Sequence, residues 1–212
     1  MRIITGSARG TKLVTAEGEN TRPTSDKVKE AVFSMIQFDV EGRTVLDLFA
    51  GSGQMGLEAL SRGAARATMI DVSRDAVNTV MNNAKKTHLF DRCRISCSDA
   101  LAFLKSAAGK EIYDIIFLDP PYASGLVADS LHTIAEGGIA IPGGTIICET
   151  DNPTDARPSR RKLPAEEKEA NELAAVLRDV FGGDETLRDR FTMRKTVSYG
   201  RTRITILTPA EG

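Results

Sequence analysis

The residues best suited to chemistry are Asp119, Pro120, Pro121 and Tyr122, which follow the apolar segment Ile112–Leu118. This segment is typical of a strand that is buried on both faces of a sheet. The two prolines end the strand, because proline lacks an N–H group and fixes φ. The carboxylate and the backbone carbonyls can accept hydrogen bonds, and the tyrosine ring offers a face for stacking. Together they could hold and polarise a planar amino group, such as the exocyclic amine of a nucleobase.

A glycine-rich loop forms a second candidate site. It follows an expected strand over residues 44–49 and reads Asp47-Leu48-Phe49-Ala50-Gly51-Ser52-Gly53-Gln54-Met55-Gly56. Glycines let the chain turn tightly and let a ligand lie against bare backbone, and the helix that follows offers free N–H groups. Asp71 ends the next expected strand, where a carboxylate can bind the hydroxyl groups of a ribose. We therefore expect a ligand that contains a nucleoside.

Gly51, Gly53 and Gly56 also match the dinucleotide-binding fingerprint, so a nicotinamide dehydrogenase is an alternative. Two features oppose it. Asp47 precedes the glycines, and its carboxylate would repel a pyrophosphate but attract the ammonium group of an amino acid. Both histidines fall in expected helices with no evident partner, so no hydride-transfer site stands out. S-adenosylmethionine, with an amino acid end and a nucleoside end, fits the pattern better.

Asp99 follows the third expected strand and has two interpretations. It could accept a hydrogen bond from an adenine amine, or it could cap the helix expected over residues 100–107, because Asp is a preferred N-cap residue. One carboxylate could do both.

The order of the expected elements indicates the fold. Expected strands cover residues 44–49, 67–71, 94–97, 113–118 and 144–149, and expected helices cover residues 25–38, 55–62, 74–88, 100–107 and 125–135. Such alternation predicts an α/β fold with a mainly parallel sheet and helices on both faces.

The two ends of the chain depart from this alternation. Residues 1–24 read as an N-terminal arm or short hairpin, and residues 25–212 as the main domain. Within that domain, residues 151–185 form a charged insertion, which we expect to be a loop over 151–171 and then a helix. Residues 192–197 and 203–207 predict an antiparallel hairpin, which brings the expected Rossmann-like sheet to seven strands.

Size and composition limit the choices further. The chain has 212 residues, 41% of them hydrophobic, which suits one well-buried domain. No stretch approaches the ~20 apolar residues of a membrane span, and three cysteines do not make a disulfide framework. We therefore expect a cytoplasmic protein without a metal site, because Cys93 and Cys97 lack companion ligands.

The charge is uneven along the chain. The net charge is −1, yet residues 1–15 hold three basic and no acidic residues, and residues 186–212 hold six basic and two acidic ones. The two ends could form one basic patch for a phosphate backbone. An ordinary solvated surface is the alternative.

The chain resembles the class I S-adenosylmethionine-dependent methyltransferases, and more narrowly the RsmD family of 16S rRNA guanine-N2 methyltransferases. The resemblance rests on residues 1–13, on residues 22–30 with Arg22-Pro23-Thr24, and on residues 47–62 with the glycine loop. The Asp119–Tyr122 box completes it. The charged insertion is a departure, since family members commonly pass almost directly from the fifth strand to the final hairpin.

The resemblance implies a role for each group of residues. The catalytic group that holds the target amine would be Asp119, Pro120, Pro121 and Tyr122. The residues that bind S-adenosylmethionine would be Asp47, Phe49, Ala50, Gly51, Ser52, Gly53, Asp71, Val72, Asp99 and Ala100. The residues that contact RNA would be Arg2, Arg9, Lys12, Arg22 and Thr24.

The implied reaction is methyl transfer to the N2 amine of a guanine in 16S rRNA, and the implied partner is that RNA, a 30S subunit or its assembly intermediate. We expect a monomer. Lys27 and Lys29 could also contact phosphate, or could be ordinary exposed helix positions.

Three other functions remain alternatives. A DNA adenine-N6 methyltransferase usually needs a target-recognition domain. A protein glutamine methyltransferase tends to carry Asn where Asp119 stands. The intact box around Asp119 argues against an RNA-binding assembly factor without catalytic activity.

Overall fold

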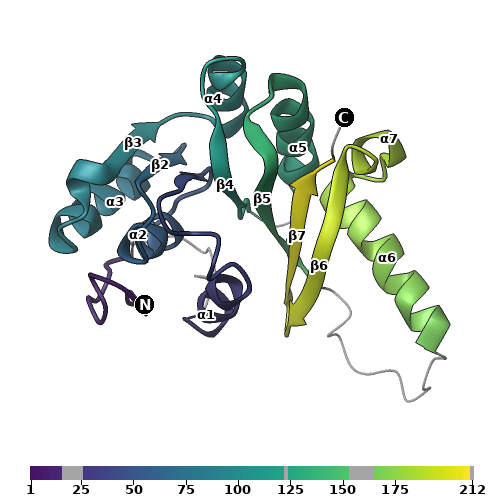
Figure 1. Cartoon of the computed structure of the whole chain (residues 1–212), viewed down its shortest axis with the longest axis horizontal. Coiled ribbons are helices and arrows are strands. Elements are labelled where there is room, and N and C mark those ends of the chain that lie inside the picture. The colour runs from purple at the N-terminus through teal and green to yellow at the C-terminus, as the bar shows by residue number, and fades with distance from the viewer. Residues whose placement is uncertain (16–25, 122–123, 153–164, 211–212) are drawn as a thin grey trace.

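The computed structural model describes residues 1–15, 26–121, 124–152 and 165–210 (Figure 1). Its centre is one seven-stranded sheet with the strand order β3-β2-β1-β4-β5-β7-β6. Its strands are β1 (Thr44–Asp47), β2 (Arg66–Asp71), β3 (Cys93–Cys97), β4 (Tyr113–Leu118), β5 (Ala140–Asp151), β6 (Phe191–Tyr199) and β7 (Thr202–Pro209). Strands β1 to β5 pair in parallel, and β7 is antiparallel to both of its neighbours. The predicted Rossmann-like sheet with a C-terminal hairpin is confirmed.

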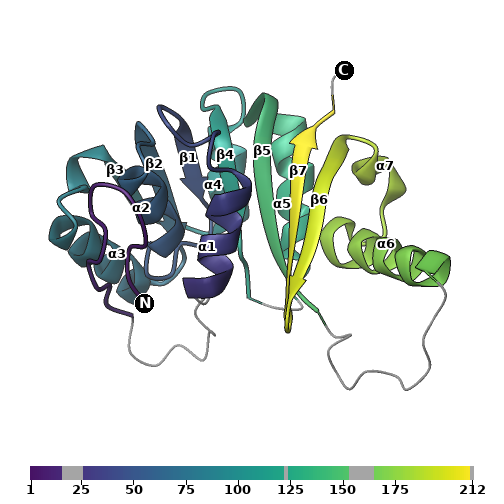
Figure 2. The same ribbon diagram turned by 60° about the horizontal axis from the view of Figure 1, so that its bottom comes forward.

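Helices cover both faces of the sheet. They are α1 (Asp26–Met35), α2 (Gln54–Ser61), α3 (Arg74–Lys86), α4 (Ala100–Ala107), α5 (Leu126–Gly137), α6 (Ala165–Phe181) and the short α7 (Glu185–Arg188), with one 3-10 turn, η1 (Phe90–Arg92). Helices α1, α2 and α3 lie on one face, and α4, α5 and α6 lie on the other (Figures 1 and 2).

Each face has its own apolar core, and β4 contributes to both. Ile115 and Phe117 belong to the core under α1 to α3, whereas Ile116 and Leu118 belong to the core under α4 to α6. Successive side chains of a strand point to opposite faces, so a strand covered on both sides needs an uninterrupted apolar run. This need explains the composition of the segment that leads to Asp119.

The structure corrects the prediction at two elements. Residues 151–171 were expected to form a loop, but α6 begins at Ala165. Residues 165–171 are mostly Ala, Glu and Lys, which favour a helix by propensity but leave no apolar stripe to reveal it. Strand β5 begins at Ala140, before Pro142 and Gly143, because its pairing with β4 shifts register there instead of ending.

Of the two interpretations of the basic ends, the structure does not support one shared patch. The N-terminal residues lie beside α2, whereas β6 and β7 form the opposite end of the sheet (Figure 1). Arg203 is 2% exposed and binds Asp179 at 2.7 Å, and Arg194 lies 3.8 Å from Asp39.

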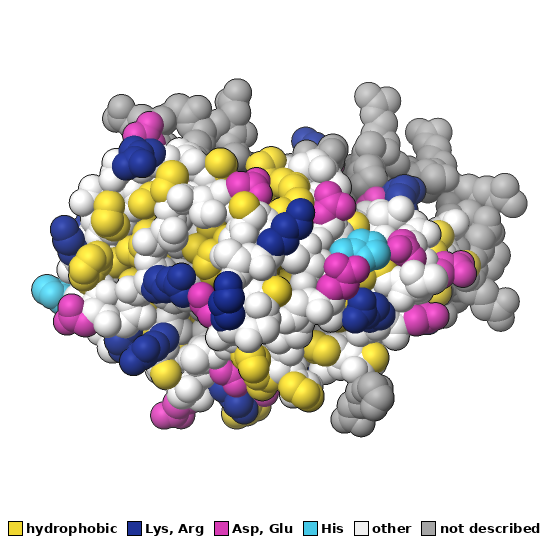
Figure 3. All heavy atoms as spheres, turned by 90° about the horizontal axis from the view of Figure 1, so that it is seen from above, with side chains coloured by type: hydrophobic (Ala, Val, Ile, Leu, Met, Phe, Trp, Pro, Cys, Tyr) yellow, Lys and Arg dark blue, Asp and Glu magenta, His cyan; other side chains and the backbone are white. Residues whose placement is uncertain are grey.

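The face over α4 and α5 shows acidic and basic side chains interspersed (Figure 3). Among the described residues, no helix is long and apolar enough to cross a membrane.

Candidate active site

Three carboxylates meet at the carboxyl edge of neighbouring parallel strands. Asp47, the last residue of β1, pairs with Met69 of β2 and with Phe117 of β4. Asp71 therefore lies two residues further along β2, and Asp119 lies two residues beyond Phe117, directly after β4 ends. The strand order reverses between β1 and β4. Open α/β sheets bind ligands at this kind of switch point, outside the carboxyl ends of the strands.

Asp47 is the buried centre of this group. Its side chain is almost inaccessible, and its Oδ2 atom accepts a hydrogen bond from the N–H of Gly56 at 3.0 Å. The pKa of Asp47 is raised to about 7, mainly by burial and to a smaller extent by the charges of Asp119 and Asp71, while the Gly56 bond opposes the shift. Asp119 and Asp71 are thus close enough for their charges to disfavour ionisation of Asp47. A cation is the ligand that would relieve their repulsion.

The glycine loop has two residues with positive φ, each for its own reason. Gly53 has φ +76°, and a Cβ atom there would lie 2.9 Å from Cγ1 of Val80. Gly51 has φ +52°, but a Cβ atom there would meet nothing within 4 Å. The packing against α3 therefore requires glycine at position 53. At position 51, the bare backbone faces open space that a ligand can use.

Asp71 joins the loop to the start of α3. Its Oδ2 atom accepts the N–H of Gly51 at 2.8 Å, and its Oδ1 atom accepts the N–H of Ser73 at 2.8 Å. A carboxylate oxygen has a second lone pair, so both atoms can still accept from the hydroxyl groups of a sugar. The next residue, Val72, is 73% exposed. It presents an apolar surface beside this carboxylate.

Asp99 caps helix α4. Its Oδ1 atom accepts the N–H of Ala102 at 2.9 Å, which confirms the N-cap interpretation. The side chain is exposed, and Ala100 behind it is buried. The end of β3 is tied to the same edge, since the N–H of Ser98 donates to the carbonyl of Asp71 at 3.0 Å. A contact of Asp99 with adenine stays a prediction.

These residues fit S-adenosylmethionine. Asp47 suits the positive amino acid end, the open backbone at Gly51 suits close approach, and Asp71 with Val72 suits a ribose next to a flat base. The remaining predicted cofactor residues share this loop: Phe49 is partly buried, Ala50 is buried, and Ser52 is partly exposed.

Asp119 and Pro120 lie at the carboxyl end of β4. Asp119 is partly exposed directly after β4, Pro120 is buried and Pro121 is exposed. Asp119 is near enough to Asp47 to affect its pKa. Tyr122, the fourth residue of the predicted catalytic group, lies outside the described residues.

The N-terminal residues 1–15 form a hairpin, here called the arm. The N–H of Ile3 donates to the carbonyl of Thr11 at 2.9 Å, and the N–H of Gly10 donates to the carbonyl of Ile3 at 2.8 Å. Arg2 and Lys12 form an antiparallel β-bridge. The side chains of Arg2, Arg9 and Lys12 are exposed, as RNA contacts require. The Arg2 side chain lies 3.9 Å from Asp26. Arg22 and Thr24, the other two predicted RNA contacts, lie outside the described residues.

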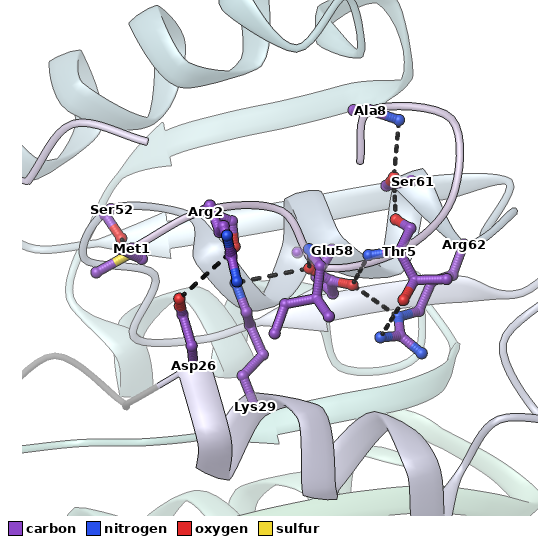
Figure 4. A network of polar contacts seen from close by, with 12 residues as sticks. Met1, Arg2, Thr5, Ala8, Asp26, Lys29, Ser52, Glu58, Ser61 and Arg62 are labelled. Atoms are coloured by element: carbon purple, nitrogen blue, oxygen red, sulfur yellow. Dashed lines mark hydrogen bonds and ion pairs between the residues drawn. The ribbon is translucent and has the colours of Figure 1, made fainter. Parts of the chain in front are cut away.

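The sequence did not reveal how this arm is held. Glu58 of α2, wholly buried, accepts the N–H groups of Ile4 at 2.7 Å and Thr5 at 3.0 Å (Figure 4). Lys29 of α1 donates to the carbonyl of Arg2 at 2.5 Å and lies 3.5 Å from Glu58. Lys29 has no exposed surface, so both of its expected roles, phosphate contact and exposed helix position, are wrong. Burial lowers its pKa, against the attraction of Glu58.

Known proteins resemble the chain over most of its length. The family model described as "Conserved hypothetical protein 95" matches residues 1–176. "Putative rRNA methyltransferase YlbH" of Bacillus subtilis (strain 168) is 38% identical over 177 residues, which cover 83% of this chain and 96% of that protein. "Ribosomal RNA small subunit methyltransferase D" of Escherichia coli (strain K12) is 34% identical over 151 residues, 71% of this chain and 75% of that protein.

The fold matches as well. The solved structure titled "Putative methyltransferase yhhF from Escherichia coli" superposes with a TM-score of 0.73 at 27% identity, and the match covers 99% of this chain and 97% of that one. The chain therefore belongs to the Conserved hypothetical protein 95 family, the RsmD family of class I S-adenosylmethionine-dependent methyltransferases, as its sequence predicts.

Proposed function

We propose that this protein transfers a methyl group from S-adenosylmethionine to the exocyclic N2 amine of a guanine in 16S rRNA. The observation that carries the proposal is the position of Asp119 and Pro120 at the end of β4, where the charge of Asp119 acts on the buried Asp47. Relatives of this chain are named as ribosomal RNA small subunit methyltransferases. The proposed place of action is the cytoplasm, and the proposed state is a monomer.

The chemistry explains why a carboxylate and a carbonyl are needed. The lone pair of a guanine N2 amine is delocalised into the ring, so the amine is a poor nucleophile. In the proposed site, Asp119 and the carbonyl of Pro120 accept hydrogen bonds from the two N–H groups of the amine, which localises the lone pair and directs it. The N–C bond forms as the bond from sulfur to the methyl carbon breaks, and the protonated amine product loses its proton to water. S-adenosylmethionine, when bound, supplies a methyl group that is already activated. Alignment of the reactants can supply on the order of 7–11 kcal/mol of the barrier reduction.

RNA binding places the base. A base must leave its stack to enter such a site, and loops of RNA release a base at lower cost than a duplex does. The exposed Arg2, Arg9 and Lys12 are the proposed contacts to the phosphate backbone. Arg22 and Thr24 are proposed to act beside them, and Tyr122 to stack on the purine.

The test is methyl transfer with labelled S-adenosylmethionine. The substrates are 30S particles from a strain that lacks the gene, naked 16S rRNA, DNA and a protein extract. We expect label in 16S rRNA, and N2-methylguanosine after nuclease digestion and mass spectrometry. Label in DNA or protein alone would overturn the proposal. Comparing 30S particles with naked rRNA identifies the substrate form, and size-exclusion chromatography with light scattering tests the monomer.

The matched variants are Asp119→Asn and Asp129→Asn, each of which removes one negative charge. Asp129 is exposed on α5. We expect Asp119→Asn to lose about 100-fold or more in turnover, in the range for one preorganised group that polarises a reacting atom. Its affinity for RNA should stay unchanged, and Asp129→Asn should keep full activity.

A further inference from the structure

Asn83 lies buried in α3 and uses its whole side-chain amide to join two segments. Its Oδ1 atom accepts the N–H of Val14 at 2.8 Å. Its Nδ2 atom donates to the carbonyl of Val14 at 2.9 Å and to the carbonyl of Ser52 at 2.9 Å. Val14 is near the end of the arm, and Ser52 is the middle residue of the glycine loop. One side chain therefore holds both.

The glycine loop needs such a tether. Ser52 stands between Gly51 and Gly53, which both have positive φ. Glycines permit many backbone conformations, so the loop needs hydrogen bonds to hold its peptide groups in one orientation. The N–H of Gly53 donates to the carbonyl of Ala50 at 2.7 Å, within the loop, and the N–H of Gly51 donates to Asp71. The bond from Asn83 holds the Ser52 carbonyl, the other polar group of the Ser52–Gly53 peptide, and ties the backbone between the two glycines to α3.

The arm touches the same residue by a second route. The hydroxyl of Ser52 donates to Sδ of Met1 at 3.2 Å (Figure 4). Met1 and Leu13 pair across the hairpin, where the N–H of Leu13 donates to the Met1 carbonyl at 3.2 Å. Both strands of the arm thus reach Ser52 at the open end of the hairpin, one directly and one through Asn83.

The opposite end of the arm is anchored separately. Ser61, at the end of α2, accepts the N–H of Ala8 at 3.0 Å and donates to the carbonyl of Thr5 at 2.6 Å. The arm therefore lies along α2 from Ser52 to Ser61. A shift of the glycine loop would therefore move the open end of the arm, while the contacts with Ser61 keep the closed end in place.

We propose that Asn83 is a positioning residue that holds the glycine loop in its binding conformation and couples it to the arm. Cofactor binding at the loop then stiffens the open end of the arm. The inference depends on the proposed cofactor loop, but not on the identity of the methylated nucleotide.

The test compares two variants at neighbouring positions, each of which replaces Asn with Asp and so adds the same negative charge. Asn83→Asp keeps an acceptor for the Val14 N–H but loses both donated bonds and sets a carboxylate against two carbonyls. Asn82→Asp is the control, because Asn82 is exposed on the same helix. Titration calorimetry with S-adenosylhomocysteine, far below the melting temperature, should show affinity reduced about tenfold or more in Asn83→Asp. The control should bind as the wild type does.

Amide hydrogen exchange of the arm, with and without ligand, distinguishes coupling from a purely structural role. A residue that only stabilises the fold would not change how the arm responds to the ligand. We expect S-adenosylhomocysteine to slow the exchange of peptides from residues 1–15 in the wild type and in Asn82→Asp. Asn83→Asp should lose this protection. If Asn83→Asp does not fold, Asn83→Ser, which is neutral and smaller, takes its place in both measurements.

Two results would overturn the inference. One is unchanged affinity for S-adenosylhomocysteine in the folded Asn83 variant. The other is arm exchange that does not respond to S-adenosylhomocysteine in the wild type. Neither measurement uses RNA, so failure here and failure of the proposed rRNA substrate are distinguishable.

Discussion

The Nζ atom of Lys29 lies 3.5 Å from Oε2 of Glu58, and neither side chain has any exposed surface. The same carboxylate binds Nε of Arg62 at 2.8 Å and accepts the N–H groups of Ile4 and Thr5. One buried charge thus joins α1, α2 and the arm (Figure 4). A buried ion pair is costly to break from one side, because the remaining charge keeps its desolvation penalty without its partner.

Glu58→Ala should therefore destabilise the protein severely. The variant leaves Lys29 buried without a carboxylate, and it leaves two N–H groups of the arm without their acceptor. We expect a loss of about 3–5 kcal/mol in the free energy of unfolding, measured by urea denaturation. Glu30→Gln, an exposed site on α1, is the control and should change stability by less than about 0.5 kcal/mol. A loss below about 1 kcal/mol for Glu58→Ala would show that the network contributes little.

Two glycines in the arm allow the cost of a steric clash to be measured apart from the cost of backbone strain. Gly6 has φ +87°, and a Cβ atom there would lie 1.8 Å from the carbonyl oxygen of Ser61. Gly10 has φ +84°, and a Cβ atom there would meet nothing within 4 Å. Gly10→Ala should cost about 1–2 kcal/mol through its left-handed conformation. Gly6→Ala should cost about 1–3 kcal/mol more, because the arm must move away from α2.

Urea denaturation of both glycine variants gives the comparison. Equal losses would mean that the arm is not packed against Ser61 in solution. The arm would then be attached to α2 more loosely than its hydrogen bonds indicate.

The sequence predicted the sheet and the strand-end carboxylates because both depend on local patterns. A strand covered on both faces needs an apolar run, and Asp47, Asp71 and Asp119 each stand where such a run ends. The glycine loop could be predicted for the same reason, since the positive φ at Gly51 and Gly53 favours glycine. These features need no knowledge of which distant segments come together.

The buried polar contacts that hold the arm and the glycine loop in place could not be predicted, because they join segments that are far apart in the sequence. Lys29 stands beside the apolar stripe of α1, where the sequence predicts an exposed side chain, yet the arm covers it. Asn83 carries no distinguishing signal in the sequence, because its partners are 69 and 31 positions away. A polar side chain carries no sequence signal for burial when the partner that satisfies it lies far along the chain.

Gly51→Ala should separate cofactor binding from stability. The substitution adds a methyl group in open space, so its structural cost is the backbone strain of about 1–2 kcal/mol. We also expect the affinity for S-adenosylhomocysteine to fall about tenfold or more, because the methyl group takes up the space proposed for the ligand.

Gly53→Ala is the matched comparison at the other end of Ser52. Its Cβ atom would lie 2.9 Å from Cγ1 of Val80, so this variant should lose more stability than Gly51→Ala does. Calorimetric titration and urea denaturation of both variants test the distinction. If Gly51→Ala binds S-adenosylhomocysteine like the wild type, the ligand does not approach the loop at this residue.

The burial of Asp47 predicts that cofactor affinity depends on pH. Its pKa is raised to about 7 in the protein, so the carboxyl is mostly neutral at pH 6 and mostly charged at pH 8. A cationic ammonium group binds the charged form better, and its binding in turn lowers this pKa. Affinity for S-adenosylhomocysteine should therefore rise as the pH increases toward 7 and level off above it, with at most about a tenfold change per unit below the pKa.

Calorimetric titrations between pH 5.5 and 8.5 test this dependence, and buffers of different ionisation enthalpy report the proton that binding releases near pH 6. Asp47→Asn is the matched variant, because it keeps the shape of the side chain and removes the titrating group. It should bind more weakly at pH 8 and show no rise in affinity between pH 6 and 8. A wild-type affinity that stays constant over this range would mean that Asp47 is already charged at pH 6 or does not face the ammonium group.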